Sequence, residues 1–279
     1  MNKLTESRYG QFIYPDKDIY IGKSLELYGE YSYFETEFLK SLVEAGDIVV
    51  DVGANIGALT VPLAQKIGPS GYMLAFEPQQ YIYYILCGNI ALNNLTNTHI
   101  FQRAVKEKSN EIITIPIFDY EKEANFGSMS SAEKADGIKL GSPVKTIMID
   151  DLKLSVPKLI KIDVEGEEYN VLQGARSTIE RSLPYLYVEC IEENQIKPIV
   201  SFFKEINYDF KFHQPPMFNE NNFFGNKTNE LNKYTGGEVA SGNFFAFSKE
   251  KGFDFSNHDF FVELEHSLHH KSLDDILKN

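Results

Sequence analysis

The chain of 279 residues is 43% hydrophobic and has 27 Lys and Arg against 40 Asp and Glu, a formal net charge of −13. This deficit of positive charge argues against a broad phosphate-neutralising face, so we expect no nucleic-acid partner. No apolar run reaches the roughly 18 residues that a membrane span needs, and the first residues lack a secretory signal pattern. Cys87 and Cys190 lie in apolar stretches, which favours buried thiols. We therefore predict a globular, cytoplasmic protein.

Strands and helices are predicted to alternate after a Tyr-rich N-terminal extension, residues 1–30, with a hairpin around 14–17. The predicted strands are 48–52, 72–76, 100–105, 159–164 and 185–189. The predicted helices are 33–44, 58–67, 80–92, 167–175 and 195–205. This alternation indicates an α/β fold with a mostly parallel sheet and helices on both faces.

Three segments depart from that alternation. Residues 106–157 are predicted to be an insertion, with an antiparallel strand over 111–118 followed by a polar loop. A second loop, 213–229, is rich in Asn and aromatic residues and precedes a strand pair that ends at Phe247. We expect one domain over 1–250 and a helical tail over 251–279. The apolar face of the tail could dock on its own domain or on a second copy, so a homodimer is one alternative.

A glycine loop follows the first buried strand. Asp51, Gly53, Asn55 and Gly57 lie where that strand ends and the next helix begins, the edge at which open α/β sheets bind ligands. Their spacing is not the GxGxxG of a dinucleotide site, and Asp51 would repel a pyrophosphate. An acid there suits the ammonium of S-adenosylmethionine, so the loop predicts this methyl donor rather than NAD.

A second acid closes the next strand. Glu77, in Ala75-Phe76-Glu77-Pro78, follows Gly57 by 20 residues. A carboxylate at this place can accept the hydroxyls of a ribose. Pro78 then fixes the chain at the turn into the next helix. We predict that both residues contact the donor.

Several motifs in order make the chain resemble the FkbM-type methyltransferases. They are Asp51-Val52-Gly53-Ala54-Asn55-Ile56-Gly57, Ala75-Phe76-Glu77-Pro78, Asn89-x-x-x-Asn93, Arg103-Ala104-Val105 and Lys161-Ile162-Asp163-Val164-Glu165-Gly166-Glu167-Glu168. The resemblance runs from about residue 28 to residue 190. It implies a class I (Rossmann-like) methyltransferase fold with a seven-stranded sheet and S-adenosylmethionine as the donor. We count Ala104 and Asp163 among the donor contacts.

Two acids after the fourth strand are candidates for the general base. Asp163 and Glu165 share one orientation if the strand persists. Methylation of an alcohol requires that its proton be removed, and a carboxylate can accept it. The helix start explains Glu167 and Glu168 as well as a function does. We predict no metal, although the two candidate acids with Glu189 and Glu192 could grip a divalent cation instead.

Other contacts are predicted from residue type. Glu30 and Tyr31 precede the first strand, where an aromatic ring could attract a sulfonium, although packing on the sheet explains them nearly as well. Amide and aromatic side chains suit an acceptor such as a sugar ring. The candidate acceptor contacts are Asn125, Phe126, Phe218, Asn222 and Phe223.

The sequence thus predicts a methyltransferase that acts on a small molecule or glycan. The acceptor is expected to be a hydroxyl of a sugar, glycan or secondary metabolite. Nitrogen of a peptide or amine is the alternative acceptor. An NAD-linked oxidoreductase and a non-catalytic nucleoside-binding module are disfavoured by the loop and by the intact acids.

Overall fold

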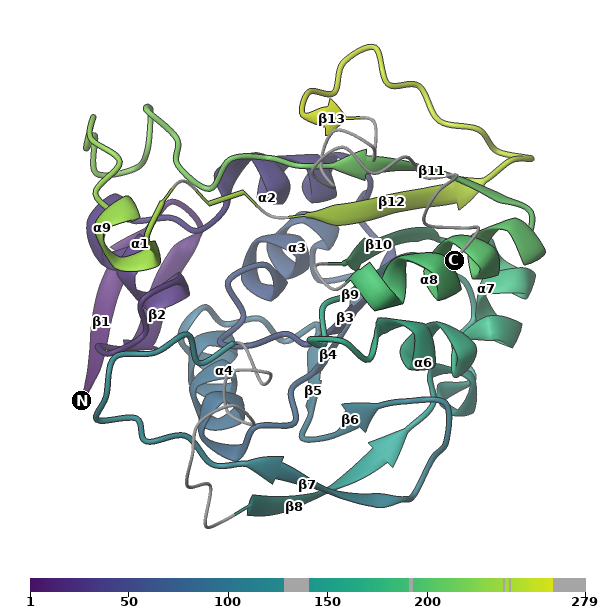
Figure 1. The fold of residues 1–279 in the computed structure, drawn as a ribbon, viewed down its shortest axis with the longest axis horizontal. Coiled ribbons are helices and arrows are strands. Elements are labelled where there is room, and N and C mark those ends of the chain that lie inside the picture. The colour runs from purple at the N-terminus through teal and green to yellow at the C-terminus, as the bar shows by residue number, and fades with distance from the viewer. Residues whose placement is uncertain (128–140, 191–192, 238, 241, 263–279) are drawn as a thin grey trace.

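The computed structural model describes residues 1–127, 141–190, 193–237, 239–240 and 242–262, and its largest sheet in these ranges has eight strands. In spatial order they are β13 (Phe261–Val262), β11 (Tyr208–His213), β12 (Asn243–Ser248), β10 (Tyr185–Glu189), β9 (Pro157–Ile162), β3 (Ile48–Val52), β4 (Tyr72–Phe76) and β5 (Thr98–Phe101). The strands from β10 to β5 are parallel, and β12 and β13 pair antiparallel with their neighbours (Figure 1). The predicted mostly parallel sheet is confirmed. The count exceeds the predicted seven because the two-residue β13 joins the edge.

Helices cover both faces of this sheet. The helices of the described ranges are α1 (Ile21–Tyr28), α2 (Tyr33–Ser41), α3 (Thr60–Ile67), α4 (Gln80–Leu92), α6 (Glu168–Gln173), α7 (Arg176–Ser182), α8 (Glu193–Glu205), α9 (Asn232–Thr235) and the 3₁₀ turn η1 (Ile149–Leu152). Of these, α1 packs on the N-terminal hairpin. None of the helices in the described ranges is long and apolar enough to cross a bilayer.

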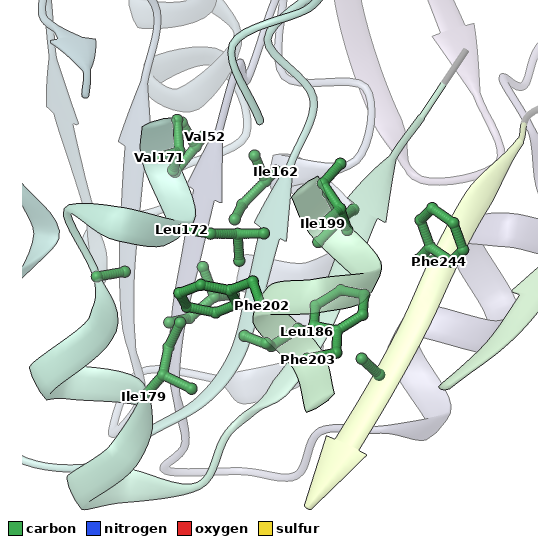
Figure 2. Packing of buried hydrophobic residues seen from close by; sticks show 14 of the residues in the cluster. Val52, Ile162, Val171, Leu172, Ile179, Leu186, Ile199, Phe202, Phe203 and Phe244 are labelled. Carbon is green, nitrogen blue, oxygen red and sulfur yellow. The ribbon is translucent and has the colours of Figure 1, made fainter. Parts of the chain in front are cut away.

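Alternation along the strands builds a core on each face of the sheet. Val50 and Val52 of β3 pack with side chains of α6, α7 and α8. Figure 2 shows this core, with Leu172, Phe202 and Phe203 reaching from the helices toward the strands. Val49 points the other way and packs with α2 and α3. Burial on both faces explains why the strands read as continuous apolar runs.

The N-terminal extension is a hairpin that docks on α4. Its strands are β1 (Asn2–Ser7) and β2 (Gly10–Pro15), so the turn lies at residues 8–9 and not at the predicted 14–17. Asn89 of α4 accepts a hydrogen bond from the Ile13 amide at 2.7 Å and donates to its carbonyl at 3.0 Å. Asn93, one turn later, makes the same pair of bonds with Gln11. The two asparagines therefore pair with the edge of β2 as a strand would.

The insertion forms a small sheet of its own beside β5. Its strands are β6 (Ala104–Val105), β7 (Ile112–Pro116) and β8 (Gly141–Ile147), in the order β6-β8-β7. β7 and β8 are antiparallel, as the alternation over 111–118 predicts. The predicted strand 100–105 is instead divided, because its last residues leave β4 and pair with β8.

The chain after β12 returns to the α2 face of the sheet. Phe245 of β12 contacts Phe253 and Phe255, and β13 then pairs with β11. A helical tail was predicted over 251–279, but residues 261–262 form a strand. The rest of the predicted tail, residues 263–279, lies outside the described residues.

Candidate active site

The glycine loop after β3 has the backbone that its sequence predicts. Gly53, Asn55 and Gly57 have φ of 77°, 51° and 89°, in the left-handed region. The amides of Gly53 and Ala54 donate to the Phe76 carbonyl at the end of β4, at 3.0 and 2.9 Å. A Cβ on Gly53 would lie 1.7 Å from the Asp163 carbonyl oxygen. The loop therefore packs directly on the segment after β9, and glycine is needed for that approach.

Asp51 is fully buried and already has two partners. Its carboxylate accepts a hydrogen bond from the Thr60 hydroxyl at 2.6 Å and lies 3.2 Å from the Lys161 ammonium. Lys161 also donates to the Gly53 carbonyl at 2.9 Å and lies 3.3 Å from Asp163. Burial lowers the pKa of Lys161, and the charges of Asp163 and Asp51 more than offset this, so the pKa lies above its usual value. The predicted contact of Asp51 with a ligand ammonium stays a prediction, and the structure places Asp163 nearer to solvent.

Glu77 lies under the glycine loop at the end of β4. Its carboxylate accepts hydrogen bonds from the amides of Asn55, at 3.0 Å, and Gln79, at 2.8 Å. Burial raises the pKa of Glu77 to about 7, although these two bonds act in the opposite direction. Each carboxylate oxygen has a further lone pair, so the group can still accept hydroxyls.

Three carboxyl groups meet at the ends of β9 and β10. Oxygens of Asp163, Glu165 and Glu189 lie within 4.8 Å of one another. Burial and the charge of Asp163 raise the pKa of Glu189 well above its usual range. Glu165 has φ of 55°, an uncommon conformation for a residue other than glycine. The predicted pair of acids is therefore a set of three, which can share a proton or a cation. Glu192, the other acid considered, lies outside the described residues.

A cavity of about 410 Å³ opens beside this set. Gly53 and Pro78 line it from the ends of β3 and β4, and Ala104, Val164 and Glu165 line it from the segments alongside. Its size lies within the range of small-molecule sites, about 300–1,000 Å³. Three predicted donor contacts, Gly53, Pro78 and Ala104, thus surround one space.

Glu30 and Tyr31 have different surroundings. Glu30 is buried, accepts hydrogen bonds from Arg8 and from Asn219 at 2.8 Å, and thereby ties the N-terminal hairpin to the loop after β11. Tyr31 is half-buried, and burial with the charges of Glu35 and Asp163 raises its pKa well above 10. Tyr31 is therefore close to the acids, whereas Glu30 fastens the loop.

The candidate acceptor contacts fall into two groups. Phe126 is 1% exposed, packs against Tyr120 and accepts a hydrogen bond through its carbonyl from Gln79 at 2.8 Å. Asn125 turns the same segment by accepting the Gly127 amide. This group covers Glu77 and the glycine loop.

The second group belongs to the loop after β11. Asn222 is buried and braces the loop internally, Phe218 packs on Tyr28, and Phe223 is 48% exposed. Phe223 donates its amide to Glu30 of the N-terminal extension, Asn222 accepts the Asn226 amide within the loop, and Phe218 packs in a cluster with Tyr28. Acceptor contact by either group stays a prediction.

The sequence indicated neither a role for Lys161, which begins one of the motifs quoted above, nor the burial of Glu35. Glu189 was already considered with Asp163 and Glu165 as a possible cation site, and the structure brings these three acids together. Glu35 is buried in α2, accepts a hydrogen bond from Ser32 at 2.6 Å, and burial raises its pKa to about 7. Lys161 had one signal, a lysine between isoleucines in a buried strand. Such a residue has to find a partner, because a buried unpaired ammonium is costly.

Comparisons with known proteins show the family of the chain. The Methyltransferase FkbM domain matches residues 51–211. The chain is 29% identical over 178 residues to Methyltransferase sdnD of Sordaria araneosa, covering 54% of this chain and 68% of that protein. It is 27% identical over 146 residues to Methyltransferase 1 of Beauveria bassiana, covering 45% of this chain and 57% of that protein.

Among solved structures, Methyltransferase FkbM from Methylobacillus flagellatus KT superposes with a TM-score of 0.48 at 17% identity. The superposition covers 77% of this chain and 48% of that one, so the chain spans about half of that enzyme. The family match covers more than half of the chain and includes the glycine loop and the acids after β9. The chain belongs to the FkbM methyltransferase family and is an S-adenosylmethionine-dependent methyltransferase with the class I fold.

Proposed function

We propose that the chain transfers the methyl group of S-adenosylmethionine to a hydroxyl of a sugar, glycan or secondary metabolite. The observation that carries this proposal is the set of Asp163, Glu165 and Glu189 beside the cavity at Gly53. An alcohol gives up its proton when it is methylated, and carboxylates placed at the reacting centre can accept it. An amine acceptor needs such an acid set less, because a neutral amine attacks without prior loss of a proton.

The residues at the cavity fit the donor. Val52, Phe76 and Ile113 give it apolar walls, which suit a purine, and Gly53 brings a backbone close to the ligand. Glu77, under the loop, would accept the ribose hydroxyls. When bound, S-adenosylmethionine supplies a methyl group on a sulfonium. Asp163 or Glu165 would then face the acceptor.

The carboxyl groups of this set differ in their surroundings, and this difference bears on how they take up the proton of the acceptor hydroxyl. Asp163 forms an ion pair with Lys161 at 3.3 Å. Burial and the neighbouring charge favour a protonated Glu189. Two close carboxyl groups can share one proton. The set can then take up the proton of the acceptor hydroxyl, which neutralises a carboxylate and adds no buried charge.

Substitution of the acids tests the proposed base. We expect Asp163→Asn or Glu165→Gln to lower turnover by about 100-fold to 10,000-fold, the usual contribution of a general base, while the donor still binds. Turnover is followed by transfer of a deuterated methyl group, and donor binding by calorimetry. Glu180→Gln is the control, because Glu180 is 52% exposed and pairs only across the surface with Arg176. Full activity in both acid variants contradicts the assignment.

The acceptor is tested with panels of sugars, polyketide-type alcohols and amines, read by the mass gained from the labelled methyl group. Methylation confined to amines contradicts the proposed hydroxyl acceptor and supports the nitrogen alternative. A thermal-shift comparison of S-adenosylmethionine, S-adenosylhomocysteine and NAD tests the donor, because a ligand that binds the folded state raises its stability. Loss of activity on exhaustive chelation would assign a cation to the three acids.

A further inference from the structure

Lys161 is a buried cation at the centre of the active site. It is 4% exposed and lies one residue before the end of β9. Its neighbours Ile160 and Ile162 point to the face of the sheet that α6, α7 and α8 cover. Alternation along the strand turns Lys161 to the opposite face, toward the glycine loop and α2. Its side chain is only 5% exposed, so the position of the ammonium is set mainly by the groups that it contacts.

Those groups come from three parts of the site. The ammonium donates to the Gly53 carbonyl of the loop at 2.9 Å, and it lies 3.2 Å from Asp51 of β3 and 3.3 Å from Asp163 after β9. The contact with Gly53 is a hydrogen bond, and the contacts with the two carboxylates are ion pairs. Lys161 therefore connects the glycine loop beside the cavity to Asp163, one of the two candidates for the general base.

Stability alone does not account for this arrangement. A buried ion pair is often no more stabilising than apolar side chains of similar volume, because both charges lose their hydration. What an apolar side chain could not do is hold a carbonyl and two carboxylates at fixed distances. Two acids against one lysine also leave a negative charge, which stays available to a cationic ligand or a proton.

We propose that Lys161 is a positioning residue for methyl transfer, which fixes Asp163 relative to the Gly53 loop so that the donor and the base keep one geometry. This inference rests on the proposed function of the site and adds a residue to it. Lys161 acts through Asp163 and Gly53 rather than by touching the reacting atoms. Alignment of the reacting groups supplies much of the acceleration in a displacement reaction, so a loose Asp163 would slow it.

A double-mutant cycle on the full chain tests the proposal. The Kd for S-adenosylmethionine is measured by calorimetry in the wild type, Lys161→Met, Asp163→Asn and the double variant. We expect Lys161→Met to raise the Kd about tenfold or more when Asp163 is present. In the Asp163→Asn background, the same substitution should raise the Kd by a factor that is at least about three times smaller. The reason is that the carboxylate that loses its partner is absent from the second background.

Lys158→Met is the matched control. Lys158 lies on the same strand, but its side chain is exposed and its ammonium lies over the Tyr185 ring. K158M should leave the Kd unchanged. Melting temperatures accompany each measurement, and if K161M does not fold, Lys161→Gln replaces it, because Gln removes the charge while it can still donate to Gly53.

The outcomes are separable. Failure of the wild type to bind S-adenosylmethionine contradicts the proposed function and not the role of Lys161. Equal, additive losses in the two backgrounds indicate a lysine that only stabilises the fold, and they overturn the positioning role. An unchanged Kd in K161M also overturns it.

Discussion

Gly53 is the residue at which the glycine loop contacts the segment after β9 that carries Asp163. Its φ of 77° favours glycine, and its Cα lies against the Asp163 carbonyl, so two separate restraints act at one position. Gly236 shares the first restraint, with φ of 80° in the left-handed region, but a Cβ there meets nothing within 4 Å. Comparison of the two glycines therefore isolates the close approach from the backbone strain.

We expect Gly53→Ala to cost far more than Gly236→Ala. A left-handed backbone costs an alanine roughly 1–2 kcal/mol, which is the whole effect expected at Gly236. Gly53→Ala adds a collision with a backbone atom, which cannot move aside as a flexible side chain does, and it should also weaken donor binding. Urea denaturation gives the free energies of unfolding, and calorimetry gives the Kd. Similar losses in the two variants would show that the loop can retreat from β9.

At this scale, sequence reasoning found the loop but not its internal partners. The loop was predictable from Asp51, Gly53 and Glu77 because the strand, the glycine turn and the second acid follow one another within 27 residues. Lys161 pairs with residues about 110 positions earlier, and no local pattern reports such a pairing. The burial of Glu35 could not be predicted for the same reason, since its neighbours Lys161 and Asn243 come from β9 and β12.

Among the elements, the N-terminal hairpin and the loop after β11 are held together by one buried carboxylate. Glu30 is 2% exposed and accepts from Arg8, from Asn219, and from the Phe223 amide at 3.1 Å. Arg8 also donates to the Asn221 carbonyl at 2.7 Å. Figure 1 shows the hairpin, α1 and α9 gathered at one end of the molecule, so this contact fastens that end.

Glu30→Gln should release the loop without unfolding the sheet. The amide keeps an acceptor but loses the charge that pairs with Arg8, which costs about 1–3 kcal/mol for hydrogen bonds to a charged group. Limited proteolysis should then cut within residues 213–231 faster than in the wild type. Glu180→Gln, a surface pair, should leave the cleavage rate unchanged. Equal rates in the two variants would mean that Glu30 does not hold the loop.

Element boundaries show what a single sequence can and cannot predict. Helix α4 was predicted to the residue, because its apolar spacing is regular and Pro78 precedes it. The helix predicted over 167–175 is α6, which ends before Gly174, where a Cβ would lie 2.2 Å from the Lys106 carbonyl, and the following helix α7 was not predicted. Asp150 then accepts the amides that begin α7, at 3.1 and 2.7 Å. Both causes lie outside the segment, so periodicity within it could not report them.

For the whole molecule, buried acids should make stability depend on pH. Burial raises the pKa of Glu35, Glu77 and Glu168 to about 7, from 4.5 in the unfolded chain. Between these values the folded state binds more protons than the unfolded state, so stability falls as the pH rises from about 4.5 to 7. His213 opposes this, because burial lowers its pKa to about 3 and the unfolded state then holds the extra proton up to 6.5. Three acids outweigh one histidine.

We therefore expect a higher free energy of unfolding at pH 5.5 than at pH 8, by about 1–3 kcal/mol. Urea denaturation at the two values measures the difference. Glu35→Gln imitates the protonated form, still accepts from Ser32, and should reduce the difference by its own share. Glu180→Gln should keep the full difference. An unreduced difference in E35Q would show that Glu35 ionises as easily in the folded chain as in the unfolded one.

The overall architecture was the most predictable feature and its edge the least. Continuous apolar runs indicate strands buried on both faces, and their alternation with helices indicates a parallel sheet. The two residues of β13 carry no such pattern. They become a strand because Phe261 stacks on His213 and packs among phenylalanines from β12 and the segment after it.

The order of the strands has a consequence for synthesis of the chain. β3 is the middle one of the five parallel strands, and its neighbour β9 is made about a hundred residues later. The Gly53 carbonyl and the Lys161 ammonium are 108 residues apart in sequence. Ribosomes add about 5–20 residues per second, so a newly made glycine loop waits several seconds for its partner. Until β9 emerges, β3 has one side of its ladder unpaired, and a nascent chain is most exposed to aggregation or capture by chaperones during that interval.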